Sequence, residues 1–178
     1  MATADVVVRR ARTADVRAIR ALVAPYVNAN VLLAKAPVSL YEDVQEFWVA
    51  VDEGEVVACG ALHVLWEDLA EIRTLAVARA RAGSGLGARV VEQLLTVARE
   101  LGVARVFVLT FETRFFARFG FREIDGTPVT HEVFDELLQS FDQGVAEFLD
   151  LERVKPNTLG NARMLLDLAS TRASAPAT

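Results

Sequence analysis

Residues 71–101 read as a short apolar strand, a glycine-rich turn and a long amphipathic helix in direct succession. The turn covers 83–87 (GSGLG), and the predicted helix runs over 86–101, where Gly102 ends it. The first amides of a helix have no partners within the helix, so such a turn favours binding of an anion such as phosphate. The nearly all-apolar run at 103–110 makes the passage strand–helix–strand, which implies a parallel pair in a sheet covered on both faces.

Patterns on either side complete an α/β fold with a central mixed, twisted sheet and helices on both faces. Gly54, within an acidic connection, predicts an antiparallel hairpin that continues as a meander into residues 69–77. A helix is expected over 14–24, with Thr13 as its N-cap and Pro25 as its end. The other expected strands lie at 6–9, 48–51, 56–65, 121–124 and 145–151, and the other expected helices at 40–47, 115–118 and 130–143.

Length and composition indicate one domain without nucleic-acid or membrane partners. The chain has 178 residues, and we expect a single domain over 1–168 and a disordered tail over 169–178. The net charge of −5 disfavours nucleic acid, and no apolar run approaches the ~20 residues that span a bilayer. Lone Cys59 and the widely separated His63 and His131 form no metal-ligand pattern, so we expect a cytoplasmic protein that binds no metal.

Five separated segments together resemble the GNAT superfamily of acetyl-CoA-dependent N-acetyltransferases. In chain order these segments are LYEDVQEFWVA, CGALHVLWEDLAEIRTLAV, GSGLGARVVEQLL, RVFVLTFETRFFARFGF and NARMLLDL. They look most like the short, single-domain N-acetylglutamate synthases, which lack a kinase-like regulatory domain. The resemblance covers roughly the whole chain before the tail, and it implies the GNAT fold.

The resemblance also implies where acetyl-CoA, the co-substrate, would bind. The pantetheine arm would pair with the backbone of Leu75, Ala76 and Val77. The pyrophosphate would be held by the amides of Ala82, Gly83, Ser84, Gly85, Leu86 and Gly87. A glycine has no Cβ to keep a phosphate away, and the helix dipole attracts negative charge. GNAT proteins commonly carry Arg or Gln at the position of Ala82, and Arg79 or Arg81 is expected to replace that contact.

Acetyl transfer to an amine needs a group that accepts a proton, and Glu71 is the candidate base. The resemblance implies a glutamate base on this strand, and an ion pair with Arg73 is the alternative role. The tyrosine that often protonates the CoA thiolate in GNAT enzymes is replaced here by Phe116, which with Phe115 would instead touch the pantetheine. Thr110 is a candidate to hold a water in a proton relay, although a strand-end hydroxyl is more often satisfied by backbone.

An acceptor amino acid with two carboxylates needs cationic or amide donors. The candidates are Lys35, Arg73, Asn161 and Arg163. Arg73 is the strongest of them because a cation inside an apolar strand needs a partner, though Glu71 or Glu112 would supply a structural one. His63 is expected to be a hydrogen-bonded core histidine, and Cys59 a packing residue.

We therefore expect an acetyl-CoA:L-glutamate N-acetyltransferase that acts directly on the α-amine, the reaction that the family supplies to arginine biosynthesis. One alternative keeps the chemistry and changes the acceptor to glutamine, another amino acid or a peptide N-terminus. A second alternative is a non-catalytic module that binds acetyl-CoA as a sensor, which the missing tyrosine and arginine favour. A small-molecule substrate and a possible homodimer are the expected partners.

Overall fold

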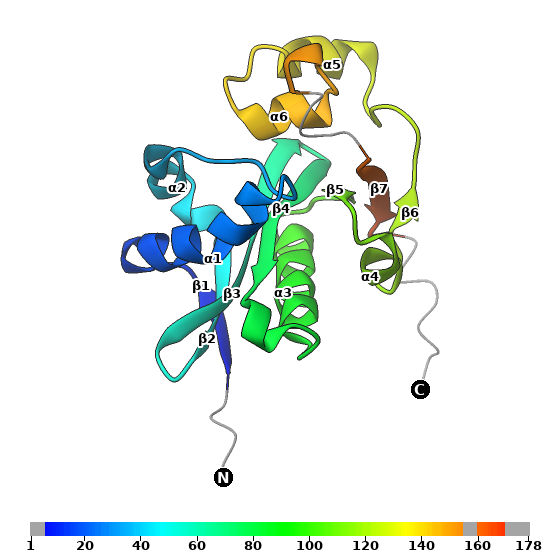
Figure 1. The fold of residues 1–178 in the computed structure, drawn as a ribbon. Helices are drawn as coiled ribbons and strands as arrows, with labels where there is room; N and C mark the ends of the chain where they lie inside the picture. Colours follow the sequence, from blue (N-terminus) through cyan, green and yellow to red (C-terminus); the bar gives the residue numbers. More distant parts are fainter. Residues whose placement is uncertain (1–5, 155–159, 170–178) are drawn as a thin grey trace, which may run out of the picture. The chain divides into compact units, whose positions relative to one another are not determined.

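The structure, a computed structural model, describes residues 6–154 and 160–169. Seven strands form one mixed sheet in the order β1-β2-β3-β4-β5-β7-β6, which confirms the α/β class (Figure 1). The chain divides into two compact units: unit 1 comprises residues 1–63 and 72–97, and unit 2 comprises residues 64–71 and 98–178. The single domain over 1–168 stays a prediction, and the expected tail after residue 169 lies outside the described residues.

Unit 1 contains an antiparallel meander and the second half of a longer strand. Its strands are β1 (Val7–Arg10), β2 (Phe47–Asp52), most of β3 (Glu55–Trp66) and β4 (Leu69–Val77) from residue 72 onward. β2 pairs with both β1 and β3 in antiparallel register. At the β2–β3 turn, Glu53 and Gly54 have φ of 48° and 88°, the left-handed values of a two-residue hairpin turn. The predicted hairpin is confirmed.

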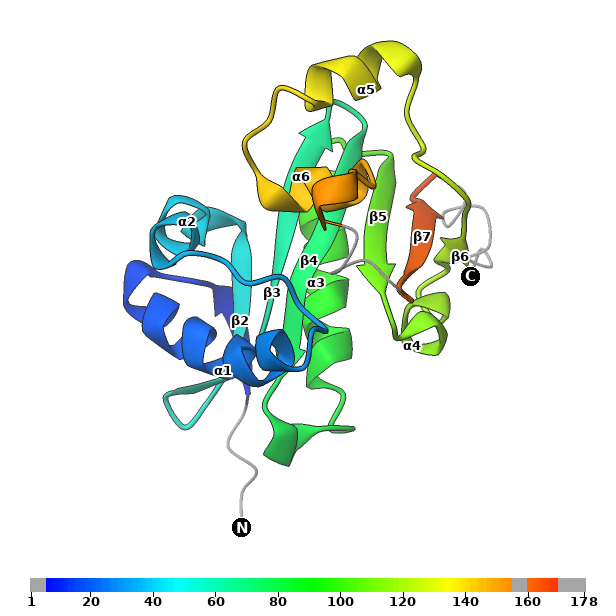
Figure 2. The ribbon, with the colours of Figure 1, turned by 45° about the horizontal axis from the view of Figure 1, so that its top comes forward.

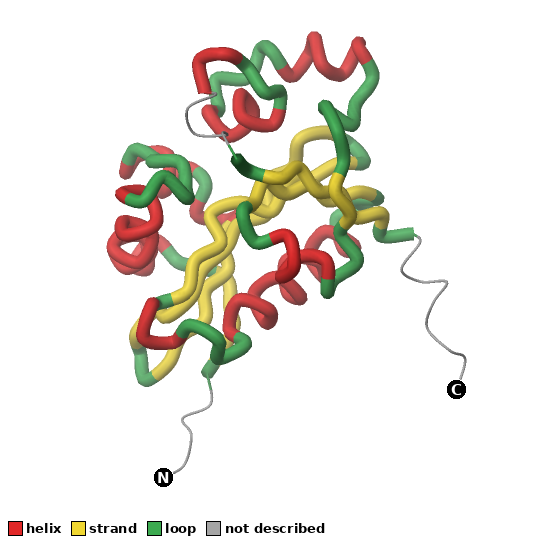
Figure 3. Tube along the Cα trace, turned by 45° about the vertical axis from the view of Figure 1, so that its right-hand side comes forward, coloured by secondary structure: helices red, strands yellow, loops and turns green. Residues whose placement is uncertain are grey.

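Helices α1 (Val16–Asn28) and α3 (Leu86–Glu100) lie on opposite faces of the unit 1 strands (Figure 3). Ile19 of α1 belongs to the same buried cluster as Cys59 and Ala61 of β3. On the other face, a Cβ built on Gly60 would come within 2.9 Å of Val90 on α3. Successive side chains of a strand point to opposite faces, so β3 presents residues 59 and 61 to α1 and residue 60 to α3.

The predictions for the ends of α1 are wrong. Thr13 lies in a 3₁₀ turn, and Asp15 holds that turn by accepting a hydrogen bond from the Arg12 amide at 2.7 Å. Pro25 lies inside α1, which continues to Asn28. The last turn persists because Tyr26 packs against the core and its hydroxyl donates to the Val77 carbonyl at 2.5 Å.

The predicted helix over 40–47 is also wrong in its position. Helix α2 covers Pro37–Glu42, a 3₁₀ turn covers Val44–Glu46, and Phe47 is the first residue of β2. Pro37 suits the first turn of a helix because its missing amide hydrogen has no partner there. Phe47 is buried in the cluster with α1, and this tertiary burial overrides its helical spacing from Leu40.

Unit 2 holds the first half of β4 together with β5 (Arg105–Thr110), β6 (Arg122–Glu123) and β7 (Ala162–Asp167). β4 pairs with β5 in parallel over residues 69–71 and 105–107, as predicted from the strand–helix–strand passage. β7 pairs in antiparallel register with all six residues of β5 and with β6. β5 is thus an interior strand of this unit, which explains its nearly all-apolar sequence.

Helices α4 (Thr113–Ala117), α5 (His131–Leu137) and α6 (Gln143–Phe148) also belong to unit 2 (Figure 2). Thr130 caps α5 as predicted, since its side chain accepts from the Val133 amide. The predicted strand over 145–151 is wrong, because Asp142 caps α6 in the same way. Val145, Phe148 and Leu149 pack into one cluster with Phe107 of β5, at the spacing of a helix face. Within the described residues no helix is long and apolar enough to cross a membrane.

Candidate active site

The glycine turn of unit 1 lies between a 3₁₀ turn at Arg79–Arg81 and the start of α3. Gly83 and Gly85 have φ of 76° and 83°, and a Cβ on either residue would meet nothing within 4 Å. The backbone conformation therefore requires glycine at both positions, and the space beside the turn is open. Gly85 begins the helix, because its carbonyl accepts from the Arg89 amide at 3.1 Å.

Four of the six amides of the predicted cradle at 82–87 fall into two groups. Those of Ala82 and Ser84 donate within the turn, to the carbonyls of Arg79 and Arg81, at 3.2 Å each. Those of Leu86 and Gly87 belong to the first turn of α3, where amides have no partner within the helix. Of the predicted cradle at 82–87, the helix start therefore offers the better donors for an anion.

The two arginines predicted to assist this turn differ in their contacts. The Arg81 guanidinium forms an ion pair with Asp52 of β2. Arg79 is exposed and forms no ion pair or side-chain hydrogen bond with the part of the chain that the structure describes. An anion bound at the turn could therefore pair with Arg79 directly, whereas pairing with Arg81 would compete with Asp52.

The second half of β4 carries a local irregularity at Thr74. This residue has φ of 56°, in the left-handed region that non-glycine residues rarely adopt, and its carbonyl accepts from the Cys59 thiol at 3.5 Å. The described pairing of β4 with β5 covers only residues 69–71, whereas β4 continues to Val77. Leu75, Ala76 and Val77 thus follow the irregularity, in the part of β4 beyond that pairing.

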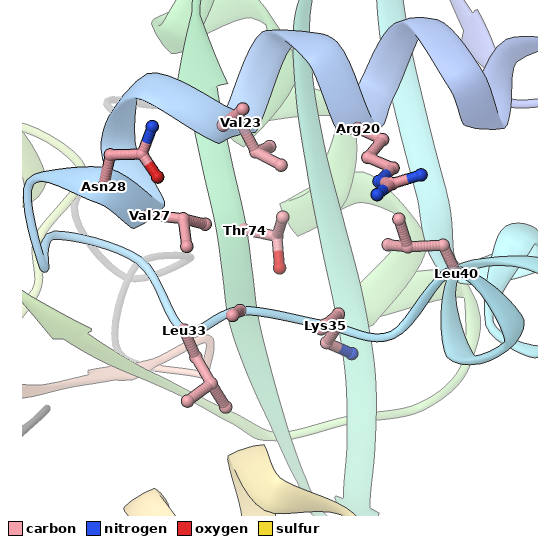
Figure 4. A pocket seen from close by; sticks show the side chains of 10 residues that line it. Arg20, Val23, Val27, Asn28, Leu33, Lys35, Leu40 and Thr74 are labelled. Carbon is pink, nitrogen blue, oxygen red and sulfur yellow. The ribbon is translucent and has the colours of Figure 1, made fainter.

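A cavity of about 210 Å³ lies beside α1 in unit 1 (Figure 4). Lys35, a predicted substrate-binding residue, lies on its wall, and Nζ of Lys35 is 2.9 Å from Oδ2 of Asp43. Arg20 and Thr74 line it as well, although the sequence analysis did not single them out. One signal was available for Arg20: it has the helical spacing of i, i+3 and i+7 with the wall residues Val23 and Val27.

Glu71, the predicted base, is 4% exposed on the half of β4 that belongs to unit 2. Its carboxylate lies near enough to the Arg163 guanidinium to act on it electrostatically: burial lowers the pKa of Arg163, while the charges of Asp150 and Glu71 oppose that shift. Arg73, two residues further along the strand, is 8% exposed. A buried carboxylate beside a buried cation is consistent with both the catalytic and the structural role of Glu71.

Arg163, a predicted substrate-binding residue, is engaged with the protein through all three guanidinium nitrogens. Nε donates to the Gly126 carbonyl at 2.8 Å, Nη1 to the Glu147 carbonyl at 3.4 Å, and Nη2 to the Phe148 carbonyl. The guanidinium also stacks 4.9 Å above the centre of the Phe107 ring. These contacts hold the end of α6 and give Arg163 a structural role in unit 2, where Asn161 is half-buried just before β7.

The remaining predicted residues of unit 2 surround the end of β5 and α4. Thr110 is buried, and its hydroxyl oxygen accepts from the Glu112 amide at 2.9 Å, which corresponds to the backbone-satisfied alternative. Phe116 is buried, and its ring makes edge contacts with two others. The distance between ring centres is 5.0 Å to Phe115 and 5.4 Å to Phe121. The position that carries an acid in many GNAT enzymes is thus part of an aromatic cluster.

His63 and Cys59 have the structural roles predicted for them. Nδ1 of His63 lies 2.7 Å from Oε1 of Glu46, so the histidine is hydrogen-bonded and partly buried. Cys59 is fully buried, and burial raises the pKa of its thiol to about 12, which excludes a reactive thiolate at neutral pH. Among the residues that the structure describes, no three His, Cys, Asp or Glu side chains are grouped to hold a metal ion.

Residues 14–121 match the family model described as Acetyltransferase (GNAT) family. The amino-acid acetyltransferase of Mycobacterium tuberculosis is 65% identical over 165 residues, which cover 91% of this chain and 94% of that relative. A solved structure of a Mycobacterium tuberculosis protein in complex with CoA and a second ligand superimposes with a TM-score of 0.89, at 65% identity, over 91% of this chain and 99% of that one.

The fold is also similar to a solved N-acetylglutamate synthase from Neisseria gonorrhoeae, complexed with coenzyme A and N-acetyl-glutamate. The TM-score is 0.73 at 24% identity, over 93% of this chain and 35% of that one, so this likeness concerns the fold alone. Among curated relatives, the amino-acid acetyltransferase of Neisseria meningitidis serogroup A is 32% identical over 121 residues, and the match covers 28% of its length.

Proposed function

Because the chain belongs to the GNAT family of acetyltransferases, we propose that it transfers the acetyl group of acetyl-CoA to the α-amine of L-glutamate. The proposal is supported by a relative named amino-acid acetyltransferase that is 65% identical along nearly its whole length. The observation on this chain that carries it is the open glycine turn at the start of α3, which suits a pyrophosphate. Such an enzyme would serve arginine biosynthesis.

Acetyl-CoA would be held by backbone groups of unit 1. The amides of Leu86 and Gly87 would donate to the pyrophosphate, and Arg79 would add one positive charge beside it. The backbone of residues 75–77 would pair with the amide groups of the pantetheine arm, as another strand would. The acetyl thioester, at the end of that arm, would then lie nearer the N-terminal half of β4.

Glu71 would act as the general base. It accepts a proton from the substrate ammonium, and the neutral amine then attacks the thioester carbonyl carbon. The new C–N bond forms as the C–S bond breaks, CoA leaves as a thiolate, and the amide nitrogen loses its second proton to solvent. Phe116 stands where the tyrosine acid would lie, and a thiolate whose conjugate thiol has a pKa of about 8.5 in water is a good leaving group without an acid.

The acceptor would bind through its carboxylates. Lys35 lies on the wall of the cavity beside α1, and Arg73 is a buried cation of β4. Both residues would supply charge-assisted hydrogen bonds to anionic groups of the amino acid. Asn161 remains a candidate amide donor, and Arg163 would support the site by holding α6 rather than by touching the substrate.

The test is release of CoA thiol by the purified protein across a panel of glutamate, glutamine, other amino acids and a peptide with a free N-terminus. We expect the highest kcat/KM with glutamate. A preference for glutamine or another acceptor would keep the acetyl transfer and replace the substrate. Calorimetric binding of acetyl-CoA without turnover of any acceptor would instead identify a sensor module and overturn the enzymatic proposal.

We also propose a cytoplasmic location, which suits a chain whose lone cysteine makes no intrachain disulfide. A homodimer is proposed as the state in solution. Sedimentation equilibrium tests it, because a mass equal to that of one 19.5 kDa chain would contradict it.

A further inference from the structure

The cavity beside α1 presents two cationic side chains and no acidic one, among the described residues that line it. Arg20 comes from α1 and Lys35 from the segment that precedes α2, while Asn28 and Thr74 add neutral hydrogen-bonding groups. The apolar part of the wall consists of Val23, Ala24, Val27, Leu33, Ala34 and Leu40. At about 210 Å³, the cavity is below the ~300 Å³ at which drug-sized pockets begin. It suits a small anion with a short hydrocarbon part.

The two cations differ in how their charge is compensated. Nζ of Lys35 lies 2.9 Å from Oδ2 of Asp43, and the two side chains are only 10% and 22% exposed, so the pair adds little net charge to the cavity. Arg20 forms no ion pair or side-chain hydrogen bond with any residue that the structure describes. Among the described residues, the cation of the cavity without an acidic partner is therefore the guanidinium of Arg20, which is an exposed residue.

A guanidinium distinguishes a carboxylate from a carboxamide. It stays protonated, and its planar N–H groups match both oxygens of a carboxylate at once. A carboxamide carries no charge and replaces one of these oxygens with an NH₂ group, which cannot accept. In Figure 4, the Arg20 side chain extends from α1 toward the space above Lys35, with Thr74 beside it. A ligand in this space would meet Arg20 and Lys35 from two sides.

We propose that Arg20 determines the acceptor specificity, by binding the side-chain carboxylate of the amino acid while Lys35 faces its α-carboxylate. The apolar wall between the two cations would pack the methylene groups of the acceptor. Arg20 thereby selects glutamate over glutamine, two acceptors that share the α-amine and differ only at the end of the side chain. This inference rests on the proposed acetyl transfer to an amino acid.

The test compares glutamate and glutamine as acceptors for the wild type and for Arg20→Ala and Arg20→Gln. Loss of a hydrogen-bonded charge should raise the KM for glutamate roughly 10- to 100-fold, with kcat and the KM for glutamine changed by less than about twofold. Arg17→Ala is the matched control, since Arg17 is an exposed cation of the same helix that does not line the cavity. Its kinetic constants should equal those of the wild type, and unchanged thermal unfolding midpoints would show that all variants are folded.

Three outcomes overturn the inference and leave acetyl transfer intact: an unchanged KM for glutamate in the Arg20 variants, an equal loss for both acceptors, or a wild type that prefers glutamine. If the wild type turns over neither acceptor, the proposed function fails, and calorimetric titration of glutamate and glutamine into the CoA-saturated protein decides about Arg20. Selective loss of glutamate binding in Arg20→Ala supports its role. Equal binding by both proteins, including the absence of binding, contradicts it.

Discussion

The carboxylate of Glu71 is buried on a strand whose neighbouring residues are almost all apolar. It is 4% exposed, and Ala70 and Ile72 beside it are also buried. Burying a carboxylate in such surroundings costs free energy unless a cation compensates its charge. Buried carboxylates are therefore found mainly in ion pairs or at catalytic sites. The electrostatic effect on Arg163 shows that a cation lies within range of Glu71, so burial alone does not separate the structural role from the catalytic one.

Kinetics of Glu71→Gln separate the two roles. Loss of a general base should lower kcat by roughly 10²- to 10⁴-fold at neutral pH. The difference in kcat from the wild type should shrink at high pH, where the substrate amine is already deprotonated in solution. Glu67→Gln is the control, because Glu67 is exposed in the turn between β3 and β4. Unchanged kcat in Glu71→Gln across the pH range, together with a lower unfolding midpoint, would make Glu71 a structural residue.

Asp15 should make the stability of the protein depend on pH. Its hydrogen bonds from Arg9, at 2.7 and 3.0 Å, lower the pKa of its carboxyl below the ordinary value of 3.8. A lowered folded-state pKa means that the stabilisation is present above about pH 4 and is lost as the pH falls through the folded-state pKa. We expect Asp15→Asn to lower the unfolding free energy by about 1–3 kcal/mol at pH 7.

Urea unfolding at pH 7 and near pH 3 measures this effect. The difference between Asp15→Asn and the wild type should shrink at the lower pH, because the wild-type carboxyl is then increasingly protonated. Asp125→Asn, at an exposed position, should follow the wild type at both pH values. An Asp15→Asn deficit that stays constant with pH would contradict the charge-based explanation.

At the scale of elements, the contact between β3 and α3 depends on the absence of a side chain at Gly60. A Cβ there would lie 2.9 Å from Cγ1 of Val90 and 3.1 Å from Cδ1 of Leu94. β-Branched Val90 has little freedom to rotate away within a helix. We expect Gly60→Ala to destabilise the protein by about 1–3 kcal/mol through overpacking.

A double-mutant cycle with Val90→Ala tests the cause. Removing the obstructing methyl groups should reduce the cost of Gly60→Ala by more than half, because the added Cβ then fills the space that Val90 leaves. Chemical denaturation of the four proteins provides the free energies. Additive effects of the two substitutions would show that overpacking against Val90 is not the cause.

At the scale of the whole molecule, the two units share three elements along the chain. The boundaries fall within β3, β4 and α3. If one unit unfolded alone, each of these two strands and this helix would have to break at an internal position. This sharing favours cooperative unfolding of the two units. A single domain over residues 1–168 stays a prediction.

The two tryptophans allow that prediction to be tested. Trp48 of β2 belongs to unit 1 and Trp66 of β3 to unit 2, and the chain has no other tryptophan. In Trp48→Phe the remaining Trp66 reports on unit 2, and in Trp66→Phe the remaining Trp48 reports on unit 1. In each variant we expect the urea midpoint measured by fluorescence to equal the midpoint measured by far-UV circular dichroism. A fluorescence midpoint that departs from the circular dichroism midpoint in either variant would show that the units unfold separately.

The sequence alone determined the elements whose signals are local. Periodicity and a glycine stop located α3, the acidic connection with Gly54 located the β2–β3 hairpin, and an apolar run located β5, because each depends on residues close together in the chain. The GNAT resemblance rested on segments spread along nearly the whole chain, and the family match agrees with it. The glycine turn was found for the same reason, since its φ values are a property of its own residues.

Tertiary contacts decided the rest. Pro25 remained inside α1 because Tyr26 is tied to Val77, and Phe47 began a strand because the cluster with α1 buries it. The contacts of Arg163 with carbonyls around α6, and the meeting of Arg20 with Lys35 at one cavity, join positions distant in the chain. Such contacts follow from the packing of whole elements and leave no local pattern, so only the folded chain shows which cations remain uncompensated for a substrate.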